Sequence, residues 1–170
     1  MHLEDYIREI PGFPKPGINF KDITPLLQHP EAMKTALDRL LKNLPETNIH
    51  KVVGIEARGF LFGTMLAEKL NAGFVPARKP GKLPFNTLKV PYALEYGMDA
   101  LEIHEDAISK DENVLLHDDV LATGGTARAA CELIEKLGGK IVQCNFLMEL
   151  KSLYGRKKLS DYPIFSLLHF

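Results

Sequence analysis

Short, almost continuously apolar segments alternate with amphipathic ones along most of the chain, and this alternation is what most constrains the fold. Apolar runs predict strands at 51–55, 73–77, 113–117, 140–147 and 164–168. Apolar residues at helical spacing predict helices at 31–44, 58–70 and 125–137. Strands that alternate with helices and carry few polar residues are typical of a parallel sheet with helices on both faces. We therefore predict an α/β fold, a parallel twisted sheet flanked by helices, with ligands bound at the carboxyl ends of its strands.

Length and composition fit one independently folding domain. The chain has 170 residues, 45% of them apolar, which is enough to bury a core without a metal or a disulfide. The two cysteines, Cys131 and Cys144, have no Cys or His nearby at zinc-ligand spacing, so we expect reduced, buried thiols. We expect a single domain over 1–170, with a small N-terminal hood at 1–30 and a mobile basic loop at 78–99.

Charge and hydropathy restrict the partners and the location. The formal net charge of −1 lacks the attraction on which nonspecific nucleic-acid binders depend, so we expect no nucleic-acid partner. The N-terminal segment MHLEDY is acidic and has no apolar core, which argues against a signal peptide. No apolar run approaches the roughly 20 residues of a membrane span, so we expect no membrane partner and a cytoplasmic location.

Two segments depart from the strand–helix alternation. Residues 3–10 suggest a short helix, after which Pro11, Pro14 and Pro16 should hold the chain extended. Residues 78–99 form an insertion rich in proline and glycine. Its basic residues are Arg78, Lys79, Lys82 and Lys89. An insertion of this length in a compact domain is either a functional loop or a solvated, disordered one.

The strongest functional signal is the stretch 114–126, which has the sequence VLLHDDVLATGGT. A buried strand brings Asp118 and Asp119 to its carboxyl end, and a Thr-Gly-Gly-Thr turn then opens a helix. Glycines let backbone N–H groups approach an anion, and the helix N-terminus adds unpaired donors and a positive dipole end. Threonine hydroxyls can donate to phosphate oxygens, while the carboxylates can accept from the vicinal hydroxyls of a ribose. The stretch therefore predicts a sugar phosphate with a free diol as substrate.

Other interpretations of this stretch are weaker. It is neither a GxxxxGK[ST] loop nor a GxGxxG turn. Asp118 and Asp119 could ligate magnesium, although that ion usually keeps its waters and binds substrate phosphates. They could also be solvated acids beside a helix cap, but adjacent acids at the end of a buried strand are costly without partners.

The stretch resembles the phosphoribosyl pyrophosphate signature of the type I phosphoribosyltransferases, in which apolar residues precede two acids and Thr-Gly-Gly-Thr. His117 departs from that pattern, because its position is usually aliphatic, and we expect a satisfied or rim histidine rather than a catalytic one. The resemblance covers nearly the whole chain and extends to the adenine phosphoribosyltransferase family through four further segments. These are PGINFKDITP at 16–25, EARGFLFG at 56–63, RKPGKLP at 78–84 and YALEYG at 92–97.

The resemblance implies a role for each segment. The residues implied to bind the phosphoribosyl group are Asp118, Asp119, Ala122, Thr123, Gly124, Gly125 and Thr126. Those implied to bind pyrophosphate are Glu56, Ala57, Arg58 and Gly59, with Arg78, Lys79 and Lys82 from the basic loop. Asn19, Phe20 and Lys21 are implied to bind the base, and Glu95 and Arg58 to be catalytic.

The residue types suit these roles. Arg58 begins a helix after a strand, and arginine binds phosphate oxygens bidentately, although a surface arginine is the plainer alternative. The ring of Phe20 can stack on a purine whose amino edge meets the backbone of Asn19 and Lys21, or it can pack in the core. Glu95 lies in an otherwise apolar and aromatic stretch, which should raise its carboxyl pKa and favour a general acid. An exposed strand glutamate is the alternative for Glu95.

The resemblance also implies a reaction, namely transfer of the phosphoribosyl group of phosphoribosyl pyrophosphate to adenine, which gives AMP and pyrophosphate in purine salvage. It implies Mg²⁺ held mainly through the substrate rather than directly by side chains, and a homodimer in which Arg78 could serve the neighbouring subunit. Two rivals stay open, a phosphoribosyltransferase for a 6-oxopurine and a nucleic-acid-binding regulator that keeps the site as a ligand sensor. The net charge of −1 and the lack of residues for an added winged or helix-turn-helix segment favour the enzyme.

Overall fold

The computed structural model describes residues 1–94 and 97–170. These residues form two compact units, Met1–Lys42 and Asn43–Phe170, and each is described by itself below. The N-terminal unit is longer than the hood expected at 1–30, because it also contains the helix that follows. None of the helices in the described part of the chain is long and apolar enough to cross a membrane.

The N-terminal unit consists of a β-hairpin and short helices. Its elements are η1 (Leu3–Tyr6), β1 (Arg8–Pro11), β2 (Asn19–Asp22), α1 (Thr24–Gln28) and α2 (Pro30–Lys42). The helix expected at 3–10 is wrong beyond Tyr6, because Arg8–Pro11 pairs antiparallel with Asn19–Asp22. The helix expected at 31–44 is confirmed as α2, which buries Ala32, Ala36, Leu37 and Leu40 at helical spacing.

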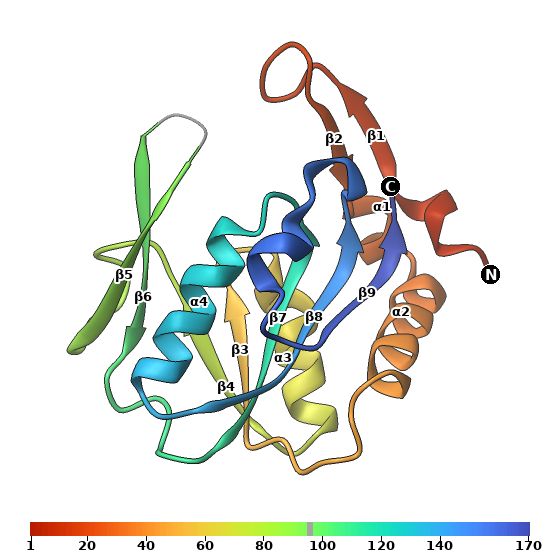
Figure 1. The fold of residues 1–170 in the computed structure, drawn as a ribbon. Coiled ribbons are helices and arrows are strands. Elements are labelled where there is room, and N and C mark those ends of the chain that lie inside the picture. Colours follow the sequence, from red (N-terminus) through yellow and green to blue (C-terminus); the bar gives the residue numbers. More distant parts are fainter. Residues whose placement is uncertain (95–96) are drawn as a thin grey trace. The chain divides into compact units, whose positions relative to one another are not determined.

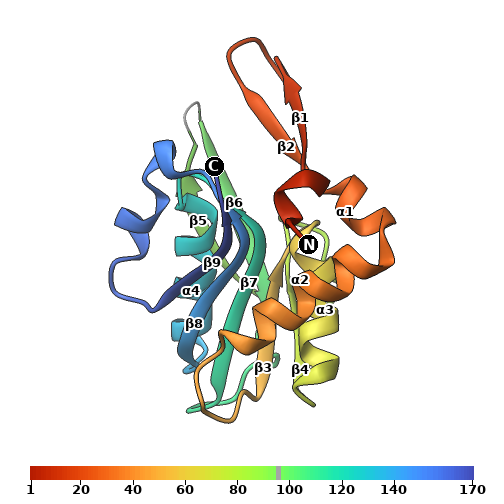
Figure 2. The same cartoon turned by 90° about the vertical axis from the view of Figure 1, so that its right-hand side faces the viewer.

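The second unit is built on a five-stranded sheet with the order β4-β3-β7-β8-β9, in which every neighbouring pair is parallel. The strands are β3 (Lys51–Ile55), β4 (Gly73–Ala77), β7 (Asn113–Leu121), β8 (Lys140–Glu149) and β9 (Ile164–His169). Helices α3 (Gly59–Lys69) and α4 (Gly125–Lys136) cover opposite faces of this sheet (Figure 1; Figure 2). The predicted parallel α/β sheet is therefore confirmed, and the bounds of β3 and β4 agree with those expected.

Strand β7 is longer than expected, because it continues through the acidic pair to Leu121. Asp118 pairs in register with Phe146 of β8, and Leu121 pairs with Glu149. Ladder hydrogen bonds need only backbone groups, so the polar side chains at 118 and 119 do not end the strand. The strand thus holds the acids on a rigid element rather than in a loop.

The insertion at 78–99 is not a loop throughout. It includes β5 (Thr87–Ala93), which forms an antiparallel hairpin with β6 (Met98–His104). Val90 and Tyr92 point to one side of β5 and are buried in the core that α4 also lines. Apolar residues at alternate positions, Leu88, Val90 and Tyr92, were the strand signal in this segment. The prolines of the segment obscured it.

Candidate active site

Three parallel strands of the second unit deliver residues of the predicted pyrophosphate and ribose sites to one edge of the sheet. Glu56 follows β3, Arg78 follows β4, and Asp118 and Asp119 lie near the carboxyl end of β7. Because β3 lies between β4 and β7 in the sheet, residues from all three motifs meet in the same crevice.

The Thr-Gly-Gly-Thr loop surrounds a hollow of about 140 Å³ at the N-terminus of α4. The hollow is lined by Asp118, Val120, Ala122, Thr123, Gly124, Thr126 and Ala127. Gly124 has a φ of 80°, a left-handed conformation that a residue with a Cβ adopts only at a cost. This turn exposes the first N–H groups of the helix, which makes the hollow suitable for a phosphate.

The first residue of the acidic pair, Asp118, lines this hollow, and Asp119 follows it on β7. Burial raises the pKa of Asp118 well above its ordinary value, and the neighbouring charge of Asp119 raises that pKa further. Burial also raises the pKa of Asp119, although the Arg58 guanidinium opposes the shift. Nε of Arg58 lies 2.7 Å from Oδ2 of Asp119, whose side chain is only 4% exposed. Burial is therefore the largest influence on the pKa of both carboxyl groups.

The segment Glu56–Gly59 packs closely against the acidic pair. A Cβ placed on Gly59 would lie 2.8 Å from Oδ1 of Asp118, so the first turn of α3 can approach β7 only as glycine. The peptide bond between Glu56 and Ala57 is cis. The two motifs that sequence analysis assigned to pyrophosphate and to the phosphoribosyl group are thus in direct contact.

Glu56 organises the basic segment that follows β4. Its carboxylate accepts hydrogen bonds from Nε and Nη2 of Arg78 at 3.2 and 3.3 Å and from the backbone N–H of Lys79 at 2.8 Å. Burial alone would raise the pKa of Glu56, but the Lys79 N–H and the Arg78 guanidinium outweigh it and hold that pKa below its ordinary value. A charged Glu56 therefore fixes both basic residues beside the crevice.

The ammonium group of Lys79 is held by the β5–β6 hairpin. It forms an ion pair with Asp99 and donates to the hydroxyl of Tyr92 at 2.8 Å. Tyr92 and Asp99 face each other in the ladder, and the Tyr92 hydroxyl donates to Asp99 at 3.2 Å. Burial would lower the pKa of Lys79, but Asp99 and Tyr92 outweigh it and raise that pKa.

His117 is fully buried within the sheet instead of at a rim. The Asn145 side-chain oxygen can only accept, so Nδ1 of His117 carries the hydrogen of their 2.9 Å bond. Its Nε2 atom has no hydrogen-bond partner among the described residues. Burial lowers the pKa of His117 to about 4, so the ring is neutral near pH 7. The expectation that His117 would have hydrogen-bond partners therefore holds for one of its two ring nitrogens.

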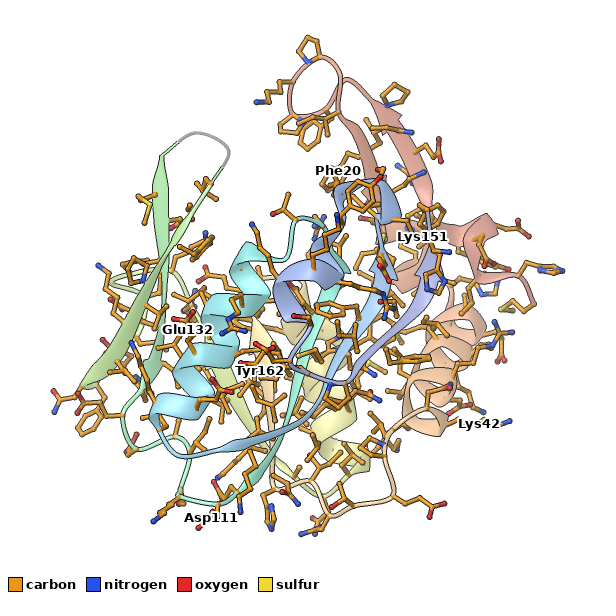
Figure 3. The ribbon with its side chains drawn as sticks, viewed as in Figure 1. Phe20, Lys42, Asp111, Glu132, Lys151 and Tyr162 are labelled. Carbon is orange, nitrogen blue, oxygen red and sulfur yellow. The ribbon has the colours of Figure 1, made fainter. Side chains whose placement is uncertain are left out.

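The base-binding candidates lie in the N-terminal unit, on β2. Phe20, labelled in Figure 3, packs edge-to-face on Phe13 with ring centroids 5.2 Å apart. Asn19 donates to Glu9 at 3.0 Å, and Lys21 forms an ion pair with the same carboxylate. The predicted catalytic residue Glu95 lies outside the described residues.

Several residues around the site were not found from the sequence. Val120 and Ala127 line the hollow, and Asp99 holds Lys79. Asp99 carries no motif signal, because its importance depends on the pairing of β5 with β6. Within the described residues, no group of three or more His, Cys, Asp or Glu side chains could hold a metal ion. The two cysteines are free and buried, with their sulfur atoms 3.6 Å apart.

The fold and the site define the class of the protein. The phosphoribosyl transferase domain model matches residues 23–169, and the chain belongs to this family.

Three similar proteins indicate which enzyme family within this class the chain belongs to. The chain is 66% identical over 170 residues to the adenine phosphoribosyltransferase of Christiangramia forsetii, covering 100% of this chain and 99% of the relative. The crystal structure of adenine phosphoribosyltransferase from Thermoanaerobacter pseudethanolicus is 52% identical in sequence, with a TM-score of 0.96. The match covers 99% of this chain and 100% of that one. The Saccharomyces cerevisiae enzyme, complexed with an imino-altritol bisphosphate and adenine, is 45% identical, with a TM-score of 0.92 and coverage of 98% and 96%. Within its class, the chain is a member of the adenine phosphoribosyltransferases.

Proposed function

We propose that this chain transfers the phosphoribosyl group of phosphoribosyl pyrophosphate to adenine and releases AMP and pyrophosphate. The observation that carries the proposal is the ion pair between Arg58 and Asp119, which joins a cation for pyrophosphate to a carboxylate for the ribose at one crevice. The solved Saccharomyces cerevisiae relative, with a sugar bisphosphate analogue and adenine, supports the same pair of substrates.

The hollow formed by residues 122–126 binds the 5′-phosphate in this proposal. Backbone N–H groups at the start of α4 and the hydroxyls of Thr123 and Thr126 donate to the phosphate oxygens. Because this phosphate does not react, its binding energy serves to place the anomeric carbon.

The acidic pair binds the ribose diol. The adjacent carboxyl groups of Asp118 and Asp119 offer hydrogen-bond partners to the two ribose hydroxyls. Binding of the diol at Asp119 competes with Arg58, which frees the guanidinium to contact pyrophosphate oxygens bidentately.

Pyrophosphate lies among the basic residues in this proposal. Arg58, Arg78, Lys79 and Lys82 bind its oxygens, and the backbone of Ala57 and Gly59 borders it. The carboxylate of Glu56 would repel pyrophosphate, so we assign it the task of holding Arg78 and the Lys79 backbone in place. Closure of the basic loop then keeps water from the reacting carbon.

Mg²⁺ fits this site as an ion carried by the substrate. Asp118 lines the hollow and the adjacent Asp119 contacts Arg58, and carboxylates combined with substrate phosphates are what magnesium prefers. When bound, the ion neutralises part of the charge on pyrophosphate, which makes it a better leaving group. The side chains supply no cage of their own in this proposal.

In the transfer step, N9 of adenine forms a bond to the anomeric carbon as the bond from that carbon to pyrophosphate breaks. The proton of N9 passes to the departing pyrophosphate or to solvent. Glu95 hydrogen-bonds the ring near N7 as charge is redistributed, and in the reverse direction it protonates N7 so that the purine leaves as a neutral base. Phe20 stacks on the purine, and the backbone of Asn19 and Lys21 recognises its amino edge. These base contacts follow from the family resemblance.

A homodimer, in which Arg78 serves the neighbouring subunit, and a cytoplasmic location complete the proposal. Sedimentation equilibrium would test the dimer. If Arg78 acts across subunits, mixed dimers of an Arg78→Ala chain and an Arg58→Ala chain should regain activity that neither chain has alone.

A purine panel tests the reaction. The chain should form AMP from adenine and phosphoribosyl pyrophosphate only with Mg²⁺, while guanine and hypoxanthine react at least about 100-fold more slowly, because a mismatched polar edge costs roughly 3 kcal/mol. If a 6-oxopurine reacts faster than adenine, the chain is instead a 6-oxopurine phosphoribosyltransferase. Binding of phosphoribosyl pyrophosphate without formation of any nucleotide would favour the nucleic-acid-binding regulator.

A further inference from the structure

A segment outside every assigned motif packs against residues 122–126, which we call the phosphate loop. It comprises η2 (Lys151–Leu153) and η3 (Gly155–Leu159), and Figure 3 labels Lys151 at its start. Gly155 is buried, and a Cβ placed on it would overlap the carbonyl oxygen of Ala122. The same Cβ would lie 2.9 Å from Cδ1 of Leu121. Gly155 thus touches the end of β7 and the first residue of the loop.

The contact is reciprocal, because Gly124 meets Gly155 in the same way. A Cβ placed on Gly124 would lie 2.5 Å from the carbonyl oxygen of Gly155 and 3.2 Å from its Cα atom. The overlapping atoms on Gly155 and on Ala122 belong to the backbone, which cannot rotate aside as a side chain could. A side chain at position 155 would therefore push the phosphate loop out of place.

An ion pair fixes η3 to the sheet beside the loop. Nε of Arg156 lies 2.8 and 2.9 Å from the two carboxylate oxygens of Glu149, whose side chain is 6% exposed. Glu149 is paired in register with Leu121, and the N–H of Leu150 donates to the Leu121 carbonyl at 2.9 Å. The paired ends of two neighbouring strands, β7 and β8, therefore carry the phosphate loop and the anchor of η3.

We propose that Gly155 is a positioning residue for the 5′-phosphate of the substrate, held in place by the Arg156–Glu149 ion pair. It acts through the backbone of Ala122 and Gly124, whose positions set the shape of the hollow. The inference rests on the proposed function of residues 122–126 as the phosphate site.

Substitution of Gly155 by alanine tests the proposal. Gly155 lies in a 3₁₀ helix without a positive φ, so alanine is allowed by the backbone and its effect is steric. Dissociation constants are measured for AMP, which carries the 5′-phosphate, and for pyrophosphate, which does not. Gly155→Ala should weaken AMP binding and raise the KM for phosphoribosyl pyrophosphate about tenfold or more, with pyrophosphate affinity changed less than about twofold.

Gly139→Ala is the matched control, because it adds the same methyl group to a crowded glycine elsewhere in this unit. Its Cβ would lie 2.9 Å from a methyl of Ile134 and 3.0 Å from one of Ile108, away from the phosphate hollow. We expect Gly139→Ala to lower the melting temperature without changing AMP affinity.

Arg156→Gln tests the same idea without added bulk, in case Gly155→Ala does not fold. It should weaken AMP binding about fivefold and leave pyrophosphate binding unchanged, and Arg156→Lys should recover part of the loss. Unchanged AMP affinity in Gly155→Ala, or in Arg156→Gln if only that variant folds, would overturn the inference. An equal loss of AMP and pyrophosphate affinity would also overturn it. Failure of the wild-type chain to bind AMP would instead refute the proposed function.

Discussion

Nε of Arg58 lies 2.7 Å from Oδ2 of Asp119, so the segment assigned to pyrophosphate is tied to the acidic pair by an ion pair at the floor of the crevice. The Asp119 carboxylate is almost fully buried, and the Arg58 side chain is 38% exposed. The Arg58 side chain can therefore turn toward a bound ligand, whereas the buried Asp119 side chain cannot. In the proposed function, this asymmetry would let one ion pair serve two parts of one substrate.

Asp119→Asn should raise the KM for phosphoribosyl pyrophosphate by about 10- to 100-fold, because a hydrogen bond to a charged group is lost. Steady-state kinetics and a melting curve check this result. Asp161→Asn is the control, since Asp161 pairs with Arg128 outside the crevice and should leave the KM unchanged. A lower melting temperature with an unaltered KM would mean that Asp119 only supports the structure near a helix cap.

Asp99→Asn should tighten pyrophosphate binding by up to about fivefold. The Asp99 carboxylate competes with pyrophosphate for the Lys79 ammonium, and a partly exposed ion pair is worth at most about 1 kcal/mol. Tyr92→Phe, which removes a neutral hydroxyl partner, should have a smaller effect. Titration calorimetry with pyrophosphate measures both. Weaker binding in Asp99→Asn would show that Asp99 instead holds Lys79 where pyrophosphate needs it.

Acidification should destabilise the fold through His117. Its pKa in the folded protein is about 4, below the ordinary value of 6.5, so between these two pH values the unfolded chain binds the extra proton. Stability therefore falls as the pH drops below 6.5, and His117 accounts for about 2 kcal/mol of loss between pH 7 and pH 5. Urea unfolding of the wild type and of His117→Gln at both pH values measures this term. An equal pH dependence in the two chains would contradict it.

Glu95→Gln should lower kcat by about 10²- to 10⁴-fold with little change in either KM. Adenine is neutral before reaction, and its charge shifts only as the bond at N9 forms. An amide can still donate a hydrogen bond to N7 but cannot transfer a proton, so the loss belongs to the transition state. Rates within about threefold of wild type in both directions would exclude the acid role.

Substrate binding should protect the basic loop from hydrogen exchange. We expect amides at 79–86 to exchange faster without ligand than with phosphoribosyl pyrophosphate and Mg²⁺. Amides of β5 that bond to β6 should be protected in both states and provide the internal reference. Equal protection of 79–86 in both states would rule out a closing lid.

The sequence by itself determined the sheet and the turn that forms the candidate phosphate site. The apolar runs at 51–55 and 73–77 became β3 and β4 with the expected bounds, because buried parallel strands need apolar residues on both faces. The stretch at 118–126 gave the hollow at the start of α4, because glycines at a strand–helix turn expose backbone donors wherever they occur.

Only the tertiary structure decided which partners those residues meet. Arg58 joins Asp119, Lys79 joins Asp99, and Gly155 fits behind Gly124, although these pairs are far apart in the chain. It also decided that Arg8–Pro11 is a strand, because pairing with β2 outweighs local helix preference. The local spacing of apolar residues and glycines specifies helices, strands and turns. Contacts between distant segments depend instead on the order of the strands in the sheet and on how closely the backbones can pack.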